Sequence, residues 1–148
     1  MKICFICHAN ICRSFISQEL LKNLIAKDAR GDIEVISRGT YALPDVEVPQ
    51  KIKNFLLKNG IDYKHHTPTQ YGKNDLSSSD LIFVMTKNQL SEIIDKYAEF
   101  SDKIFLLSDY VSNDNADVKD PINLEGGSFE RAAFKLKDLI SILYKKIK

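Results

Sequence analysis

Cys7, Arg13 and Ser14 are the residues of this chain whose types and spacing could do chemistry together. Cys7 ends an apolar run that begins at Lys2, and a helical pattern follows Ser14. A turn from a strand into a helix leaves unpaired backbone N–H groups that bind a tetrahedral anion. These N–H groups would also stabilise a thiolate at Cys7, while the planar guanidinium of Arg13 can hold two phosphate oxygens. The pattern predicts a cysteine nucleophile that forms a thiophosphate.

The elements that must position these residues alternate between strands and helices. Buried strands are predicted at Lys2–Cys7, Ile33–Ser37, Asp80–Met85 and Lys103–Leu107, and helices at Phe15–Lys27, Val48–Lys58, Lys87–Tyr97 and Ser128–Ile147. Apolar strands without alternation indicate a parallel sheet that is covered on both faces. We expect one α/β domain over residues 1–148: a four-stranded parallel sheet with helices on both faces and a phosphate-binding loop after the first strand.

Three loops should meet at the carboxyl edge of this sheet, where open parallel sheets bind ligands. They cover residues 8–14, 38–47 and 109–127. The third loop is polar, acidic and long enough to suggest a function. Cys7 and the acidic residues of the third loop should therefore share one crevice.

The stretch from Cys7 to Ser14 is followed by a helix, and an Asp120-Pro121 pair occurs near the C-terminus. In these features the chain resembles the low-molecular-weight protein tyrosine phosphatases. The family signature reads Cys-x-x-Asn-x-Cys-Arg-Ser-Pro. This chain matches it at Cys7, Asn10, Cys12, Arg13 and Ser14, but has Ala9 where glycine is common and Phe15 for the proline. The resemblance spans nearly the whole chain and implies hydrolysis of phosphotyrosine proteins or small aryl phosphates through a cysteinyl phosphate, without metal or organic cofactor.

The resemblance also implies roles for the loop. Ser14 would donate a hydrogen bond to the thiolate, and Asn10 would help to hold the loop's shape. The backbone amides and the arginine would hold the phosphate, which makes the expected phosphate-binding set His8, Ala9, Asn10, Ile11, Cys12, Arg13 and Ser14.

The general acid must be chosen among Asp109, Asp114, Asp117 and Asp120, which all fall in the third loop. Pro121 biases the residue before it towards an extended conformation and stiffens the loop, which suits a carboxylate that points into the site. The family's Asp-Pro pair matches the same position. We therefore predict Asp120 as general acid.

The mouth of the site departs from the family pattern. Ile122-Asn123 stand where the family usually has aromatic residues, and Leu43 falls near its other aromatic position, with Tyr41 close by. We expect Tyr41, Leu43 and Ile122 at the mouth and an aromatic phosphate as substrate, with a weaker preference for tyrosyl substrates.

The three histidines receive different expectations. His8 replaces a residue that is usually apolar in the family, and either flanks the substrate ring or faces solvent. His65 lies five residues after Gly60, where the family often has a histidine bonded to the loop asparagine, whereas His66 has no such counterpart. A solvated loop histidine is an equal alternative for both.

Competing cysteine motifs fail on geometry. Cys4 and Cys7 match the spacing of a redox pair, and with His8 that of a haem attachment site, but positions three apart in a strand point to opposite faces. A zinc site that adds Cys12 fails for the same reason. We expect Cys4 in the core, and Cys12 as a regulatory thiol that could form a disulfide with Cys7.

Three rival functions stay open. A thioredoxin-coupled arsenate reductase shares this fold and the cysteine–arginine spacing, but needs further cysteines and the chain has none after Cys12. An arginine-phosphate phosphatase tends to have threonine where Ile11 stands. A phospho-residue binding module would need neither a nucleophile nor an acid.

Composition limits the remaining classes. The 148 residues carry 21 Lys and Arg against 20 Asp and Glu, a net charge of +1, so nucleic-acid binding is not indicated. The first apolar run is too short for a signal peptide, and no stretch of about 18 apolar residues could span a membrane. We expect a cytoplasmic protein without membrane or nucleic-acid partners, whose oligomeric state the sequence leaves open.

Overall fold

The computed structural model describes residues 1–63 and 65–148. Its strands are β1 (Lys2–Cys7), β2 (Glu34–Gly39), β3 (Leu81–Val84) and β4 (Ile104–Leu106). Its helices are α1 (Arg13–Lys27), α2 (Gln50–Lys58), α3 (Lys73–Ser78), α4 (Lys87–Lys96), α5 (Leu107–Ser112) and α6 (Gly126–Ile147), with a 3₁₀ helix η1 (Ala98–Lys103). None of the helices within these ranges is long and apolar enough to cross a bilayer.

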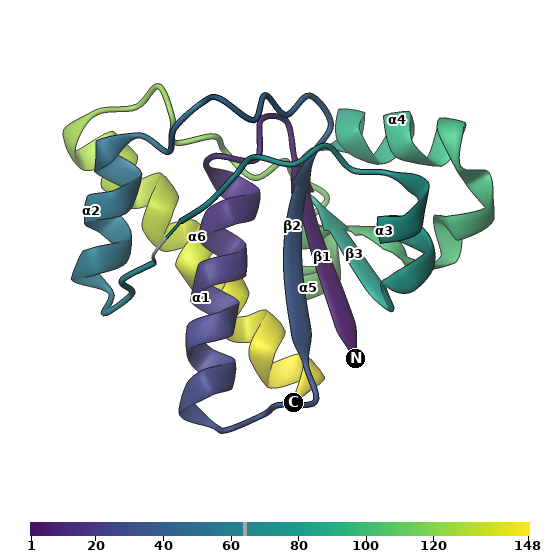
Figure 1. Ribbon diagram of the computed structural model, residues 1–148, viewed down its shortest axis with the longest axis horizontal. Helices are drawn as coiled ribbons and strands as arrows, with labels where there is room; N and C mark the ends of the chain where they lie inside the picture. The colour runs from purple at the N-terminus through teal and green to yellow at the C-terminus, as the bar shows by residue number, and fades with distance from the viewer. Residues whose placement is uncertain (64) are drawn as a thin grey trace.

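The four strands form one parallel sheet in the order β2-β1-β3-β4, with helices on both faces (Figure 1). Alternate residues of β1 face different cores: Phe5 and Cys7 join the core that contains α1 and α6, whereas Cys4 and Ile6 join the core beneath α3 and α4. The expected fold class is confirmed, and Cys4 and Cys7 lie on opposite faces as predicted.

Two short helices were not predicted. α3 and α5 have six residues each, too few for a hydrophobic period to be visible in the sequence. Because α5 takes the start of the expected loop 109–127, Asp109 lies in a helix and the loop is reduced to residues 113–125, which we name the acid loop. The 3₁₀ helix η1 was not predicted either, and elsewhere the differences are at boundaries: α2 starts at Gln50, after Pro49 with an extended ψ.

The loop that follows β2 lies directly against the loop that follows β1. Thr40 N–H donates to the carbonyl of Cys7 at 2.9 Å, and Tyr41 N–H donates to that of His8 at 2.8 Å. A Cβ atom at Gly39 would lie 2.7 Å from the His8 carbonyl oxygen. Glycine at position 39 therefore allows the approach that brings two of the three expected loops together.

Candidate active site

Cys7 is the last residue of β1 and only 3% exposed, and α1 begins six residues later at Arg13. Its Sγ lies 3.0 Å from Ser14 Oγ. The N-terminus of α1 has neither a side-chain cap nor an acidic residue in its first turn, so its positive end is open to an anion. Residues 7–14, the phosphate loop, thus bring the thiol and the helix N-terminus together as predicted.

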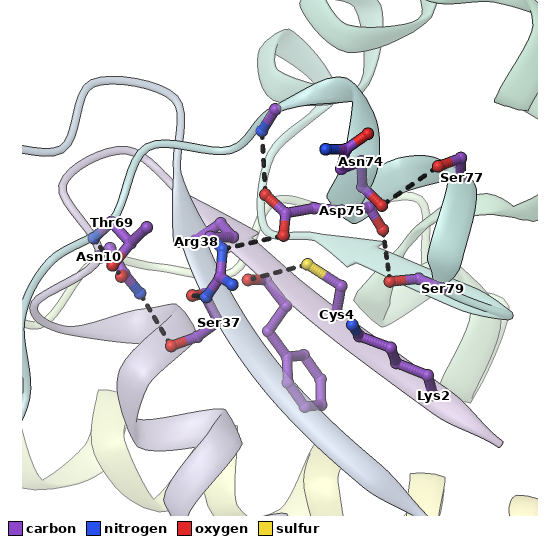
Figure 2. A network of polar contacts seen from close by, with 12 residues as sticks. Lys2, Cys4, Asn10, Ser37, Arg38, Thr69, Asn74, Asp75, Ser77 and Ser79 are labelled. Atoms are coloured by element: carbon purple, nitrogen blue, oxygen red, sulfur yellow. Dashed lines mark hydrogen bonds and ion pairs between the residues drawn. The ribbon is translucent and has the colours of Figure 1, made fainter.

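Asn10 organises the phosphate loop from the inside. It is fully buried with φ of 59°, in the left-handed region that asparagine tolerates better than most residues. Thr69 N–H donates to its Oδ1 at 3.0 Å, so its Nδ2 must be the donor to Ser37 Oγ at 2.9 Å (Figure 2). The same Nδ2 donates to Ser14 Oγ at 2.8 Å. Since Ser14 Oγ accepts from Asn10, its own hydrogen is free to donate to the Cys7 sulfur.

His66, and not His65, contacts the loop asparagine. His66 Nε2 lies 2.6 Å from the carbonyl oxygen of Asn10, so this nitrogen carries the hydrogen, and the ring stacks on Phe15 with centroids 4.1 Å apart. Burial lowers the pKa of His66, although the bond to Asn10 opposes this. His65 is exposed and bonds Thr67, which agrees with the alternative of a solvated loop histidine, and the contact with the asparagine comes from His66 instead.

Arg13 is 7% exposed and reaches across to the acid loop. Its Nη1 donates to the Val118 carbonyl at 3.1 Å, and its Nη2 lies 3.4 Å from Asp120 Oδ2. Its Nε is buried and has no partner among the described residues. A buried N–H group without an acceptor is costly, and an anion in the phosphate loop would supply one.

Of the four carboxylates considered, Asp120 is the one beside Arg13 in the described chain. The others are exposed: Asp109 lies on α5, Asp114 makes no ion pair with a described residue, and Asp117 accepts a hydrogen bond from Lys87 N–H at 2.8 Å. Asp120 Oδ1 accepts from Ile122 N–H at 3.0 Å, which fixes the carboxylate. The geometry favours the choice of Asp120 over the other three.

The rings of His8 and Tyr41 lie together beside the phosphate loop. The two rings are stacked, with centroids 5.7 Å apart and planes 13° from parallel, and Tyr41 is 62% exposed. Leu43 is also exposed further along the same loop, whereas Ile122 is half-buried against the main core. The structure thus brings one of the three expected mouth residues, Tyr41, into contact with the phosphate loop.

Cys4 and Cys12 are both buried free thiols, as is Cys7. Burial raises the pKa of Cys4 to about 12, and this thiol lies in the core as expected. Burial, reinforced by the negative charge of Asp120, also raises the pKa of Cys12. Cys12 therefore remains a neutral thiol at physiological pH.

Sequence reasoning missed the residues that support the loop from other elements, namely Ser37, Gly39, Thr69 and the Val118 carbonyl. Ser37 carried a signal, because it is a polar residue in an apolar strand next to the expected edge. Thr69 and Val118 act through backbone atoms, which no side-chain pattern reveals.

The chain is similar to known phosphatases along its full length. The family described as low molecular weight phosphotyrosine protein phosphatase matches residues 2–148. A protein-arginine-phosphatase of Geobacillus stearothermophilus is 30% identical over 99% of this chain and 95% of its own length, and a putative low molecular weight protein-tyrosine-phosphatase of Klebsiella pneumoniae is 30% identical over 96% and 93%. The solved tyrosine phosphatase of T. tengcongensis superimposes with a TM-score of 0.92 at 27% identity and covers 99% of both chains. The chain belongs to the low molecular weight phosphotyrosine protein phosphatase family of hydrolases.

Proposed function

We propose that the protein hydrolyses phosphotyrosine in proteins or small aryl phosphates through a phosphocysteine at Cys7. One observation carries the proposal: Cys7 Sγ faces the Ser14 hydroxyl at an open helix N-terminus, while Arg13 beside it has a buried Nε without an acceptor. A phosphate placed there would accept from that Nε and from the loop amides, with its phosphorus next to the sulfur.

In the first step, the Cys7 thiolate attacks phosphorus in line with the leaving group. The S–P bond forms as the P–O bond to the phenol breaks. Ser14 stabilises the thiolate before attack, and Arg13 with the loop amides stabilises the charge on the equatorial oxygens. Asp120 gives its proton to the departing phenolate, whose conjugate acid has a pKa of about 10.

In the second step, water attacks the phosphocysteine and the S–P bond breaks. Asp120, now ionised, takes a proton from this water, and the thiolate leaves with inorganic phosphate as the product. The contact between Arg13 and Asp120 positions this carboxyl group beside the site in both steps, as a protonated acid in the first and as a carboxylate in the second.

Arginine phosphate is the second candidate substrate, because relatives named protein-arginine-phosphatase match the whole chain at 26% and 30% identity. Ile11 favours the tyrosyl substrate. Its side chain is apolar and can make no hydrogen bond, whereas a threonine hydroxyl could accept one from the N–H groups of a phosphoguanidine. The stacked His8 and Tyr41 rings offer aromatic faces against which a phenyl ring can pack.

A comparison of three phosphopeptides tests this choice. We expect a higher kcat/KM for phosphotyrosine than for phosphoarginine, and least for phosphoserine, whose alkoxide is a poor leaving group. Ile11→Thr should shift the ratio towards phosphoarginine, because the substrate guanidine then finds a hydrogen-bond partner. Ile11→Val is the matched control, since valine has the shape of threonine without the hydroxyl.

A preference of the wild-type protein for phosphoarginine would overturn the tyrosine proposal. Equal shifts of the substrate ratio in the Ile11→Thr and Ile11→Val variants would overturn the role of Ile11. Steady release of phosphate excludes a binding module. Arsenate reduction coupled to thioredoxin would support the reductase instead, although the chain has no cysteine after Cys12.

A further inference from the structure

A cavity of about 300 Å³ lies between the acid loop and α6, lined by residues other than those of the phosphate loop. Residues 114 and 116–119 form one wall, and the first half of α6 forms the other. The acid loop is held in place by two hydrogen bonds: Val118 N–H donates to the Met85 carbonyl at 2.8 Å, and Ser108 Oγ, at the cavity, donates to the carbonyl of Ala116. The cavity is therefore framed by backbone that is fixed on the sheet side.

Three cationic side chains line this cavity: Lys119, Arg131 and Lys135. None of them forms an ion pair with any residue in the ranges 1–63 and 65–148. Arg131 makes one long side-chain hydrogen bond, from Nη2 to Ser128 Oγ at 3.3 Å, which leaves most of its donors for a ligand. Asp117 also lines the cavity, but its Oδ1 already accepts from Lys87 N–H, and Asp114 adds a second carboxylate.

The N-terminus of α6 adds to the positive potential of the cavity. This helix of 22 residues has no side-chain cap and no acidic residue in its first turn, where Ser128 lines the cavity. Glu125, which precedes the helix, is the nearest acid in sequence and pairs with Lys51 of α2. Glu125 is the N-cap residue, and its pairing with Lys51 leaves the first turn of α6 without an acidic side chain of its own.

The floor of the cavity is apolar. Val118 and Leu139 are nearly buried but line it, together with the side chain of Ala132. Cations around an apolar floor match a ligand with an anionic head and an apolar body. A free inorganic ion would use the cations but leave the floor in contact with water.

The same acid loop segment connects the cavity to the phosphate loop. Val118 contributes to the cavity wall, and its carbonyl accepts from Arg13 Nη1. Lys119 precedes Asp120, the carboxylate beside Arg13. A ligand that pairs with Lys119 and α6 would therefore restrain the segment that holds both Arg13 and Asp120.

We infer that this cavity is a second binding site for a small organic anion with an apolar body, and that its occupancy changes turnover at the phosphate loop. The effect on turnover rests on the proposed function, whereas binding does not. Because the ligand restrains the segment that positions Arg13 and Asp120, kcat changes although the ligand does not touch the phosphate loop.

The probe is 2-naphthoate, with 2-naphthamide as its neutral counterpart. Binding is followed by NMR on isotope-labelled protein with one equivalent of orthovanadate, which fills the phosphate loop. We expect saturable shifts at residues 114–119 and 128–139 for naphthoate, and binding at least tenfold weaker for the amide. The kcat for an aryl phosphate, measured at saturating substrate, should change at least twofold when naphthoate fills the cavity.

The double variant Arg131→Ala, Lys135→Ala should weaken naphthoate binding at least tenfold. Lys145→Ala is the matched control, because it removes an exposed lysine from the last turn of the same helix, outside the cavity. Equal binding of acid and amide, or equal affinity in the double and control variants, would overturn the site. Binding at the cavity with unchanged kcat would overturn the coupling. Absence of phosphatase activity in the wild-type protein as well as in both variants would instead overturn the proposed function.

Discussion

The two sides of the candidate active site are built differently. On the phosphate side, Cys7, Asn10 and Arg13 are nearly buried, and Asn10 alone joins Ser14, Ser37 and Thr69 through hydrogen bonds. On the leaving-group side, the Asp120 side chain is 40% exposed and Tyr41 stands out into solvent beside His8. One side is preorganised by the core, and the other is held by a few contacts between loops.

This difference separates two tasks. Phosphate is the same in every substrate, so a fixed network that presents N–H donors needs no adjustment. The leaving group differs between substrates, and the exposed residues that would contact it can change without loss of the buried network. Disruption of the phosphate side should therefore affect all substrates alike, and changes on the other side should depend on the leaving group.

The largest effect is expected for Arg13→Lys. An ammonium cannot replace a planar guanidinium that spans the Val118 carbonyl, Asp120 and the phosphate, so kcat/KM should fall by on the order of 10²- to 10³-fold for every phosphate ester. Steady-state kinetics on phosphotyrosine and p-nitrophenyl phosphate measure this. Arg38→Lys is the matched control, because Arg38 pairs with Asp75 at 3.1 Å away from the loop (Figure 2). Similar losses in both variants would contradict the account.

Asp120→Asn should give a smaller and selective effect. The loss should reach on the order of 10²-fold with phosphotyrosine, but less with p-nitrophenyl phosphate, because a weakly basic leaving group needs little protonation. Asp109→Asn, which alters an exposed carboxylate on α5, is the control and should leave both rates nearly unchanged. Equal slowing of the two esters by Asp120→Asn would make its role positional.

How far the sequence predicts the structure follows the same division. The strand β1, the phosphate loop and the place of Arg13 were predictable because Cys7, Arg13 and Ser14 lie within eight consecutive residues, so that one short motif encodes their geometry. Asp120 required Pro121 and the family resemblance, since four carboxylates fell in one loop. The sequence could not reveal that Val118 contributes a carbonyl or that His66 replaces His65, because both depend on the path of extended segments far from the motif.

Mild peroxide should inactivate the enzyme reversibly through a Cys7–Cys12 disulfide, a moderate effect confined to the phosphate side. Since burial raises the pKa of Cys12, the disulfide should form faster as pH rises and frees its thiolate. Mass spectrometry before and after dithiothreitol, with and without Cys12→Ser, measures it. Equal recovery in both proteins would show that Cys12 is not the resolving thiol.

The smallest effect concerns pH and stability. Because burial lowers the pKa of His66, the folded state binds fewer protons than the unfolded state, so stability should be full above the unfolded pKa of about 6.5 and fall as pH drops through the folded pKa. His66→Gln keeps a donor for Asn10 and should flatten this dependence of the thermal midpoint, whereas His65→Gln should not. The same slope in both variants would remove His66 as the cause.

The phosphocysteine itself is the most direct test of the account. Asp120→Asn enzyme mixed with p-nitrophenyl phosphate should accumulate the intermediate, because departure of nitrophenolate needs little acid help but hydrolysis of the S–P bond lacks its base. Acid quench and peptide mass spectrometry should then find phosphate on the peptide that contains Cys7, at the sulfur, and none in the Cys7→Ala, Asp120→Asn protein. A burst of nitrophenol without phosphate on Cys7, or phosphate on another residue, would contradict the central claim.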